Sequence, residues 1–228
     1  MATPREDFLS GLTDFAPVLL GIIPFGMVSG VAAVTAGFTG VQALGMSLIV
    51  FAGASQLAAI ELIQADAPAA IIVLTAVIVN VRLMMYSASL APYFRSFSRL
   101  RKWICAYLLT DPAFALSITE FTADETTDRL WYYLGTTIPG WVMWQVGTVV
   151  GILLGVRVPP EWQLEFAVPL IFMTLLFGAI EDRATAGAAV VAGIVAIAGT
   201  ALPFNLGLPT AALLGIAVGL ALERRDSA

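Results

Sequence analysis

Residues 67–92 read APAAIIVLTAVIVNVRLMMYSASLAP, and this run decides the fold class. About 20 apolar residues are enough for one helix to cross the hydrocarbon layer of a bilayer. The run is longer than that and holds one charged residue, Arg82. A guanidinium at bilayer depth costs from about 2.5 to over 10 kcal/mol, so it is usually paired, faces a cavity or reaches the interface. We therefore predict a transmembrane helix that carries a charge in need of an explanation.

The rest of the chain has the same apolar character. Of 228 residues, 59% are hydrophobic and 12% are charged, and the mean hydropathy is +0.91, whereas a soluble domain carries roughly 25% charged residues. Three long tracts without charge lie between Asp14 and Glu61, between Arg129 and Arg157, and between Arg183 and Glu223. The composition predicts a multi-pass protein of the cell membrane, surrounded by the lipid bilayer and without a nucleic-acid partner.

Several kinds of chemistry lack their usual residues. The sequence has no histidine, the commonest metal ligand and the usual base near neutral pH, and a single cysteine, which excludes an intramolecular disulfide. A Ser–His pair cannot form, and no Gly-x-x-x-x-Gly-Lys-Ser/Thr loop for nucleotide phosphates occurs. We expect no enzyme activity, no catalytic residue, no metal and no cofactor.

Hydrophobic tracts and their punctuation predict an all-α bundle of seven or eight transmembrane helices in one domain, residues 1–228. The predicted helices are 15–36, 41–63, 68–91, 103–121, 130–154, 166–180, 184–201 and 208–222. The last two are shorter than a perpendicular span, so they form either two tight crossings or one crossing and a re-entrant piece. Asp14 is expected to cap the first helix.

The charges of the loops predict the topology. Four basic residues and no acid follow the third helix, so the positive-inside rule places that loop in the cytoplasm. These residues are Arg95, Arg99, Arg101 and Lys102.

The two halves of the chain share a weak similarity. TDFAP begins at residue 13 and TDPAF at residue 110, and Gln56 and Gln145 occupy similar places after them. This favours a 3+3 inverted repeat followed by C-terminal helices, the plan of many secondary transporters. Its halves would be residues 13–94 and 103–182. Chance identity of this extent is the alternative.

The first two helices contain candidate site residues. Pro24 and Gly26 favour a broken first helix near the midplane, because carbonyls freed by a proline in hydrocarbon must be satisfied by protein, ligand or cavity water. Close helix packing at the glycine is the alternative. In the second helix, Gly53 and Ser55 precede Gln56, whose amide suits a ligand or another helix equally.

Polar residues form a stripe on the third helix. Arg82, Tyr86 and Ser89 are spaced i, i+4 and i+7 and share one face, while Asn80 belongs to a neighbouring stripe. Arg82 is about 15 Å from the helix end at Pro92, given the 1.5 Å rise per residue, which is too far for comfortable snorkelling. The arginine is therefore expected to need a partner.

Asp111 is the predicted partner of Arg82. It lies inside the fourth helix, and Pro112 breaks that helix and leaves the carboxylate beside free backbone groups. A buried aspartate without a cation would take up a proton, whereas a nearby arginine keeps it ionised. Asp111 is therefore either a structural counter-ion or a proton-coupling group.

Four ordered motifs carry a resemblance to a known family. They are Pro24-Phe25-Gly26, Phe51-Ala52-Gly53-Ala54-Ser55-Gln56, Asn80-Val81-Arg82 followed by YSASLAP from residue 86, and LTDPAFA from residue 109. In order, spacing and chain length they resemble the AzlC family, the large subunit of branched-chain amino-acid exporters. The later pattern of Gly135, Trp141, Gly147 and Gly151 extends the match over most of the chain. Pro112 stands where the family often has an acidic residue; if that acid serves coupling, this chain couples differently.

The resemblance implies a secondary exporter of branched-chain amino acids, often with methionine, that works with a small AzlD-like membrane subunit. We hypothesise that the broken first and fourth helices present amides to the substrate carboxylate. Arg82 and Asp111 would balance charge, Gln56 and Asn80 would give orienting hydrogen bonds, and proton coupling is the expected energy source. The candidate substrate-binding and coupling residues are Pro24, Gly26, Gly53, Ser55, Gln56, Asn80, Arg82, Tyr86, Asp111 and Pro112.

Other functions are alternatives to coupled export. A passive channel would conduct without coupling, and an assembly subunit would leave transport to its partner. An intramembrane enzyme is disfavoured, because Asp111 has no obvious second intramembrane aspartate with which to form a dyad.

Overall fold

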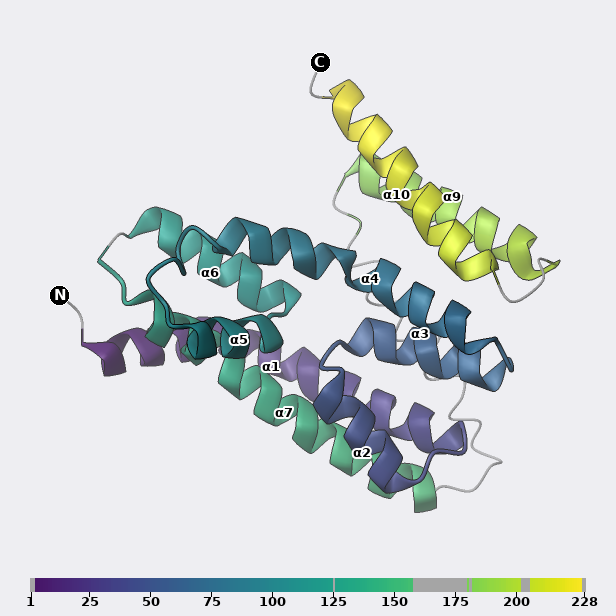
Figure 1. The fold of residues 1–228 in the computed structure, drawn as a ribbon, viewed down its shortest axis with the longest axis horizontal. Coiled ribbons are helices and arrows are strands. Elements are labelled where there is room, and N and C mark those ends of the chain that lie inside the picture. The colour runs from purple at the N-terminus through teal and green to yellow at the C-terminus, as the bar shows by residue number, and fades with distance from the viewer. Residues whose placement is uncertain (1–2, 125, 158–179, 181, 202–205, 227–228) are drawn as a thin grey trace. The chain divides into compact units, whose positions relative to one another are not determined.

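The computed structural model describes residues 3–124, 126–157, 180, 182–201 and 206–226. The elements assigned in this part of the chain are all helical, which confirms the all-α class (Figure 1). Four helices are long and apolar enough to cross a membrane: Pro4–Thr35, Ala69–Leu90, Arg129–Gly155 and Gly207–Arg224. The predicted helix 166–180 lies, apart from its last residue, outside the described residues.

The chain divides into two compact units, and each is described by itself. The first comprises Met1–Gly53 and Asn80–Arg157, and the second Ala54–Val79 and Val158–Ala228. The first unit contains α1 (Pro4–Thr35), α2 (Gly40–Ile49), α5 (Arg99–Tyr107), α6 (Asp111–Ala123) and α7 (Arg129–Arg157). The second contains most of α3 (Gly53–Gln64), α9 (Arg183–Ala198), the 3-10 helix η3 (Gly199–Ala201) and α10 (Gly207–Asp226). Helix α4 (Ala69–Leu90) begins in the second unit and ends in the first.

Helix α1 is longer and less interrupted than the sequence predicts. It begins at Pro4, and a reciprocal pair of hydrogen bonds between Thr3 and Glu6 forms a capping box at its start. The helix runs on through both of its prolines, so the break expected at Pro24 and Gly26 is wrong. A membrane helix tolerates the hydrogen bond lost at a proline when a neighbouring helix packs against it.

Asp14 lies inside α1 and does not cap it, contrary to the prediction. Its Oδ2 accepts a hydrogen bond of 2.8 Å from the hydroxyl of Tyr132 on α7. The Asp14 side chain thus links α1 to α7. The N-cap of α1 is Thr3.

Helices α1 and α7 pack against each other in parallel. Gly11 near the start of α1 lies against Tyr132, and Gly26 farther along lies against Trp144, so residue numbers rise together in both helices. A Cβ on Gly26 would come within 2.8 Å of the Trp144 carbonyl oxygen. Gly26 therefore allows close packing, the alternative explanation of this residue. The parallel direction is the one expected of a first and a fifth crossing.

Two predicted helices are each interrupted. The predicted helix 103–121 is divided into α5 and α6 by residues 108–110, which confirms the break near Asp111 and Pro112. The predicted helix 41–63 is divided into α2 and α3, and the Ala52 amide donates to the Val50 carbonyl oxygen at 2.6 Å in the tight turn between them. This second break was not predicted, because no proline marks it.

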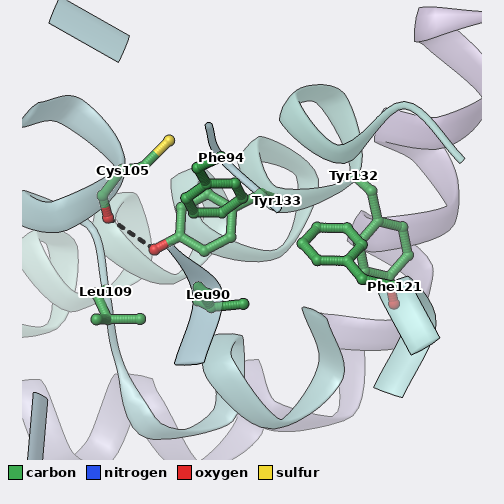
Figure 2. Packing of buried hydrophobic residues seen from close by; sticks show 7 residues of the cluster. All are labelled: Leu90, Phe94, Cys105, Leu109, Phe121, Tyr132 and Tyr133. Atoms are coloured by element: carbon green, nitrogen blue, oxygen red, sulfur yellow. Dashed lines mark hydrogen bonds between the residues drawn. The ribbon is translucent and has the colours of Figure 1, made fainter. Parts of the chain in front are cut away.

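An aromatic cluster fixes α5 and the preceding turn on α7 (Figure 2). The Tyr133 hydroxyl donates a hydrogen bond of 2.7 Å to the carbonyl oxygen of Cys105, drawn as the dashed line. The buried members of the cluster are Leu90, Phe94, Cys105, Leu109, Phe121, Tyr132 and Tyr133. Because Leu109 belongs to the α5–α6 break, this core holds the break in place.

In the second unit, α9 and α10 form an antiparallel hairpin. A Cβ on Gly215 would lie 2.9 Å from the Ala192 Cβ, and one on Gly219 would lie 3.3 Å from the Ala188 Cβ, so residue numbers run in opposite directions. Helix α10 reaches the length of a membrane span, whereas α9 is among the shorter apolar helices. The unit also contains an open cavity of about 420 Å³. It is lined by Glu61, Leu62, Ala65, Ala196, Ile197, Gly199, Thr200, Gly207 and Leu208.

Candidate functional site

Arg82 and Asp111 form the ion pair that the sequence predicts. The Arg82 Nη1 lies 3.1 Å from the Asp111 Oδ1. The two side chains are 44% and 45% exposed. A half-exposed ion pair within an apolar helix should face water or a polar partner, because hydrocarbon would leave both charges poorly solvated.

Tyr86 completes this cluster. Its hydroxyl donates a hydrogen bond of 3.2 Å to the same Asp111 Oδ1, and its ring stacks on Phe114 with centroids 4.3 Å apart. Arg82 and Tyr86 are one helical turn apart on α4, which explains why both reach one carboxylate. Asp111 Oδ2 accepts no hydrogen bond from the described residues, so it is available to a further donor.

The break between α5 and α6 places Asp111 at a helix N-terminus. Asp111 is the first residue of α6, and Pro112 follows it in the first turn, where its missing N–H is not needed. Thr110 occupies the N-cap position without a side-chain capping hydrogen bond. The positive end of the α6 dipole therefore adds to Arg82 in favouring negative charge at this point.

The break between α2 and α3 lies beside the break between α5 and α6. Tyr107, the last residue of α5, donates a hydrogen bond of 2.6 Å to the Leu48 carbonyl oxygen near the end of α2. Its hydroxyl also accepts one of 2.9 Å from the Trp141 Nε1. Phe51 in the α2–α3 turn lies against both Tyr107 and Trp144, with ring centroids 6.2 and 6.3 Å apart.

A buried polar cluster fastens α2 to α7 close to these breaks. The Ser47 hydroxyl donates to Gln145 Oε1 at 3.0 Å, accepts from Trp144 Nε1 at 2.9 Å, and lies 3.3 Å from the Thr148 hydroxyl. Gln145 Nε2 also donates to the Ser47 carbonyl oxygen at 3.4 Å. These polar side chains form hydrogen bonds with one another, so the cluster links α2 to α7.

The other predicted site residues lie on α3 and α4. Gly53 begins α3, and a Cβ there would collide with the ring of Trp144, so this glycine makes room for the tryptophan. Ser55 and Gln56 are buried on α3 in the second unit, and Gln56 Oε1 accepts no hydrogen bond from a described residue. Asn80 is partly buried on α4, two residues before Arg82.

Sequence reasoning found the ion pair but missed the residues that join the two breaks. A lone charge in an apolar run requires a counter-charge, and Asp-Pro marks a helix start, so the pair and its position were detectable. No motif marks Tyr107, and Trp141 is named only in the pattern that carries the family resemblance. Their hydroxyl and indole N–H groups were the available signal, because the polar tip of a tyrosine or tryptophan in an apolar segment needs a hydrogen-bond partner. No group of three or more possible metal-ligating side chains occurs in the part of the chain that the structure describes.

Comparison of the sequence with known proteins identifies one family. The model of the AzlC family, described as AzlC protein, matches residues 17–158, which include Arg82, Tyr86 and Asp111. The chain is 30% identical to "Inner membrane protein YgaZ" of Escherichia coli (strain K12), over 93% of this chain and 87% of that protein. It is 32% identical to an "Uncharacterized membrane protein" of Archaeoglobus fulgidus, over 91% and 92% of the two chains.

A third relative has a more specific name. The chain is 24% identical to "Branched-chain amino acid transport protein AzlC" of Bacillus subtilis (strain 168), over 74% of this chain and 66% of that protein. No solved structure matches the chain. The extent of the family match and the 30% identity to a relative of similar length lead to one conclusion: the chain belongs to the AzlC family of membrane proteins.

Proposed function

We propose that this protein is the large subunit of a secondary exporter that moves branched-chain amino acids, often with methionine, out across the cell membrane. Membership of the AzlC family gives it a membrane-transport-related role. The finer assignment is supported by the name of the Bacillus subtilis relative and by the Arg82–Asp111 pair. Proton coupling and a small AzlD-like partner subunit are part of the proposal.

The half-exposed ion pair is the observation that carries the proposal. An amino acid at neutral pH is a zwitterion, with a carboxylate and an ammonium on one carbon. Arg82 has five N–H donors in a planar fork that suits a carboxylate, and one of its nitrogens meets Asp111. Asp111 Oδ2 is available to accept from an ammonium. The substrate would therefore place its carboxylate at Arg82 and its ammonium at Asp111.

The surroundings of the pair suit an aliphatic side chain. Tyr86 and Phe114 form a stacked aromatic surface next to Asp111. Such a surface can contact a branched chain by dispersion and burial of apolar area while the charged head stays at the ion pair. Asp111 is also the carboxylate that would carry the coupling proton, at the place where α6 begins.

The exposed surface of α4 supports the proposal of a partner subunit. Only 6% of the apolar window of this helix is buried, and large side chains such as Val73, Val77 and Met84 are exposed. A helix of this composition must be covered by lipid, by another part of the chain or by another membrane protein. We propose that the small subunit covers part of α4 next to the ion pair.

Efflux measurements test this function. Isotope-labelled leucine, isoleucine, valine and methionine are loaded into cells that express the chain with or without a co-expressed small subunit. We expect faster efflux of at least the branched-chain amino acids when both subunits are present. Unchanged efflux of all four would overturn the proposal. In proteoliposomes, leucine should change the lumenal pH, whereas an ohmic current without a pH change would indicate a passive pore.

A further inference from the structure

Helix α5 contacts the first unit with one face only. Cys105 is buried, and its carbonyl oxygen is held by Tyr133. On the opposite side, Leu100 and Trp103 are 70% and 69% exposed. At about 100° per residue these two side chains fall in one narrow sector of the helix. In a membrane protein, an exposed sector of this kind faces lipid, and the indole ring of Trp103 suits the interface between headgroups and hydrocarbon.

A cluster of basic residues lies at the start of the same helix. Arg95, Arg99, Arg101 and Lys102 are all exposed, and no acidic residue occurs between Asp66 and Asp111. No carboxylate in the described part of the chain pairs with any of the four. The Lys102 Nζ is bonded to the Arg95 carbonyl oxygen at 3.1 Å, which draws the lysine towards the preceding turn. The chain as a whole has a net charge of −5, so this positive cluster is a local feature.

The positive charge and the lipid-facing sector occupy one short element. On a helical projection, Arg99 lies about 40° from Trp103, whereas Arg101 lies about 100° from Leu100 on the other side of the sector. The α5 N-terminus adds the positive end of its dipole, and Ser98 caps it through a 3.5 Å hydrogen bond from the Arg101 amide. The anion that a bilayer presents at its interface is the phosphodiester of a lipid headgroup.

We propose that α5 and the turn before it bind an anionic phospholipid. The phosphodiester lies at the N-terminal end of α5, where Arg95, Arg99 and Arg101 are exposed, and an acyl chain lies along Leu100 and Trp103. Clusters of four or more basic residues directly beside a membrane helix have the charge that attracts anionic lipids. The site is separate from the Arg82–Asp111 pair, and its occupancy does not depend on the proposed transport function.

A lipid bound here would add to the contacts that hold the N-terminal end of α5. The other end of the helix is Tyr107, which joins the two helix breaks through Leu48. The lipid would add to the aromatic cluster at one end of α5, and this hydrogen bond holds the other end. The lipid should therefore raise the thermal stability of the protein as well as bind to it.

The proposal is tested with purified protein in a neutral detergent. Phosphatidylglycerol or phosphatidylcholine is added, and the lipid retained is measured by native mass spectrometry and the melting temperature by tryptophan fluorescence. We expect the natural chain to retain phosphatidylglycerol preferentially and to melt at a higher temperature with it. The double variant Arg99→Gln/Arg101→Gln should retain about tenfold less of this lipid, because two cations are lost. The control Arg183→Gln, an exposed arginine next to Asp182, should behave like the natural chain.

Two results would overturn the lipid site. One is equal retention of the two lipids by the natural chain, and the other is unchanged phosphatidylglycerol retention in a double variant that melts normally without lipid. A salt titration of the natural chain gives a test that needs no variant: phosphatidylglycerol retention should fall with ionic strength and phosphatidylcholine retention should not. Displacement of the lipid by inorganic phosphate at constant ionic strength would indicate a soluble anion and also contradict the proposal.

Discussion

The hydroxyl of Tyr107 donates a hydrogen bond of 2.6 Å to the carbonyl oxygen of Leu48, and so joins the end of α5 to the end of α2. Both residues lie within two positions of a helix break. A carbonyl near the end of a helix lacks its usual intrahelical partner, and in a membrane it must find another. The tyrosine supplies that partner, so each of the two interrupted helices stabilises the other.

Replacing Tyr107 with phenylalanine tests this link. Tyr107→Phe removes the donor to Leu48 and the acceptor of Trp141 while keeping the ring, so the unfolding free energy should fall by about 1–3 kcal/mol. The melting temperature of the purified protein measures the effect. Tyr93→Phe is the matched control, because the Tyr93 hydroxyl has no hydrogen-bond partner among the described residues. Equal melting temperatures for both variants would show that the link does not stabilise the protein.

Arg82 and Asp111 should behave as one unit in transport. Arg82→Ala or Asp111→Asn leaves the other charge without its partner, and each should lower leucine efflux by about tenfold or more. The double variant should be less impaired than the two single losses predict together, because it leaves no lone charge. Efflux from cells with equal membrane levels of each variant measures this coupling, and fully additive losses would contradict it.

The same pair of variants separates transport from assembly. If the chain only assembled its partner, Arg82→Ala and Asp111→Asn would weaken co-purification with the small subunit. A transporting subunit should lose efflux while the complex stays intact. Co-purification and efflux are therefore measured on the same membranes, and loss of the complex with unchanged efflux per complex would favour the assembly function.

The glycines between α1 and α7 should be intolerant of a side chain. A Cβ on Gly147 would come within 2.6 Å of the Ile23 carbonyl oxygen, and backbone cannot give way as a flexible side chain can. Gly147→Ala should therefore destabilise the protein by about 1–3 kcal/mol. Gly21→Ala in α1 is the control, because a Cβ there meets no atom within 4 Å, and it should be neutral or stabilising by up to about 1 kcal/mol. A melting temperature unchanged by Gly147→Ala would contradict the close packing seen here.

What the sequence predicted and what it missed have physical causes. The helices and the Arg82–Asp111 pair were predictable because a bilayer penalises charge so strongly that composition and spacing carry the signal. The break expected at Pro24 was wrong because a neighbouring helix supports the backbone there. The break after Val50 was missed because its stability comes from tertiary contacts, chiefly those of Tyr107 and Trp144 with Phe51. The inverted repeat and the roles of Ser55, Gln56 and Asn80 stay predictions.

The proposed zwitterion site predicts which molecules compete with leucine. Leucinamide lacks the carboxylate that would bind Arg82, and N-acetylleucine lacks the ammonium that would bind Asp111. Each analogue can therefore contact only one residue of the pair. Each loses one charge-assisted hydrogen bond to the pair, so each should compete about tenfold more weakly than isoleucine, which keeps both groups. Competition is measured by the concentration that halves uptake of labelled leucine into inverted membrane vesicles. If leucinamide competed as well as isoleucine, Arg82 could not be the carboxylate ligand, and export of leucine itself would still stand.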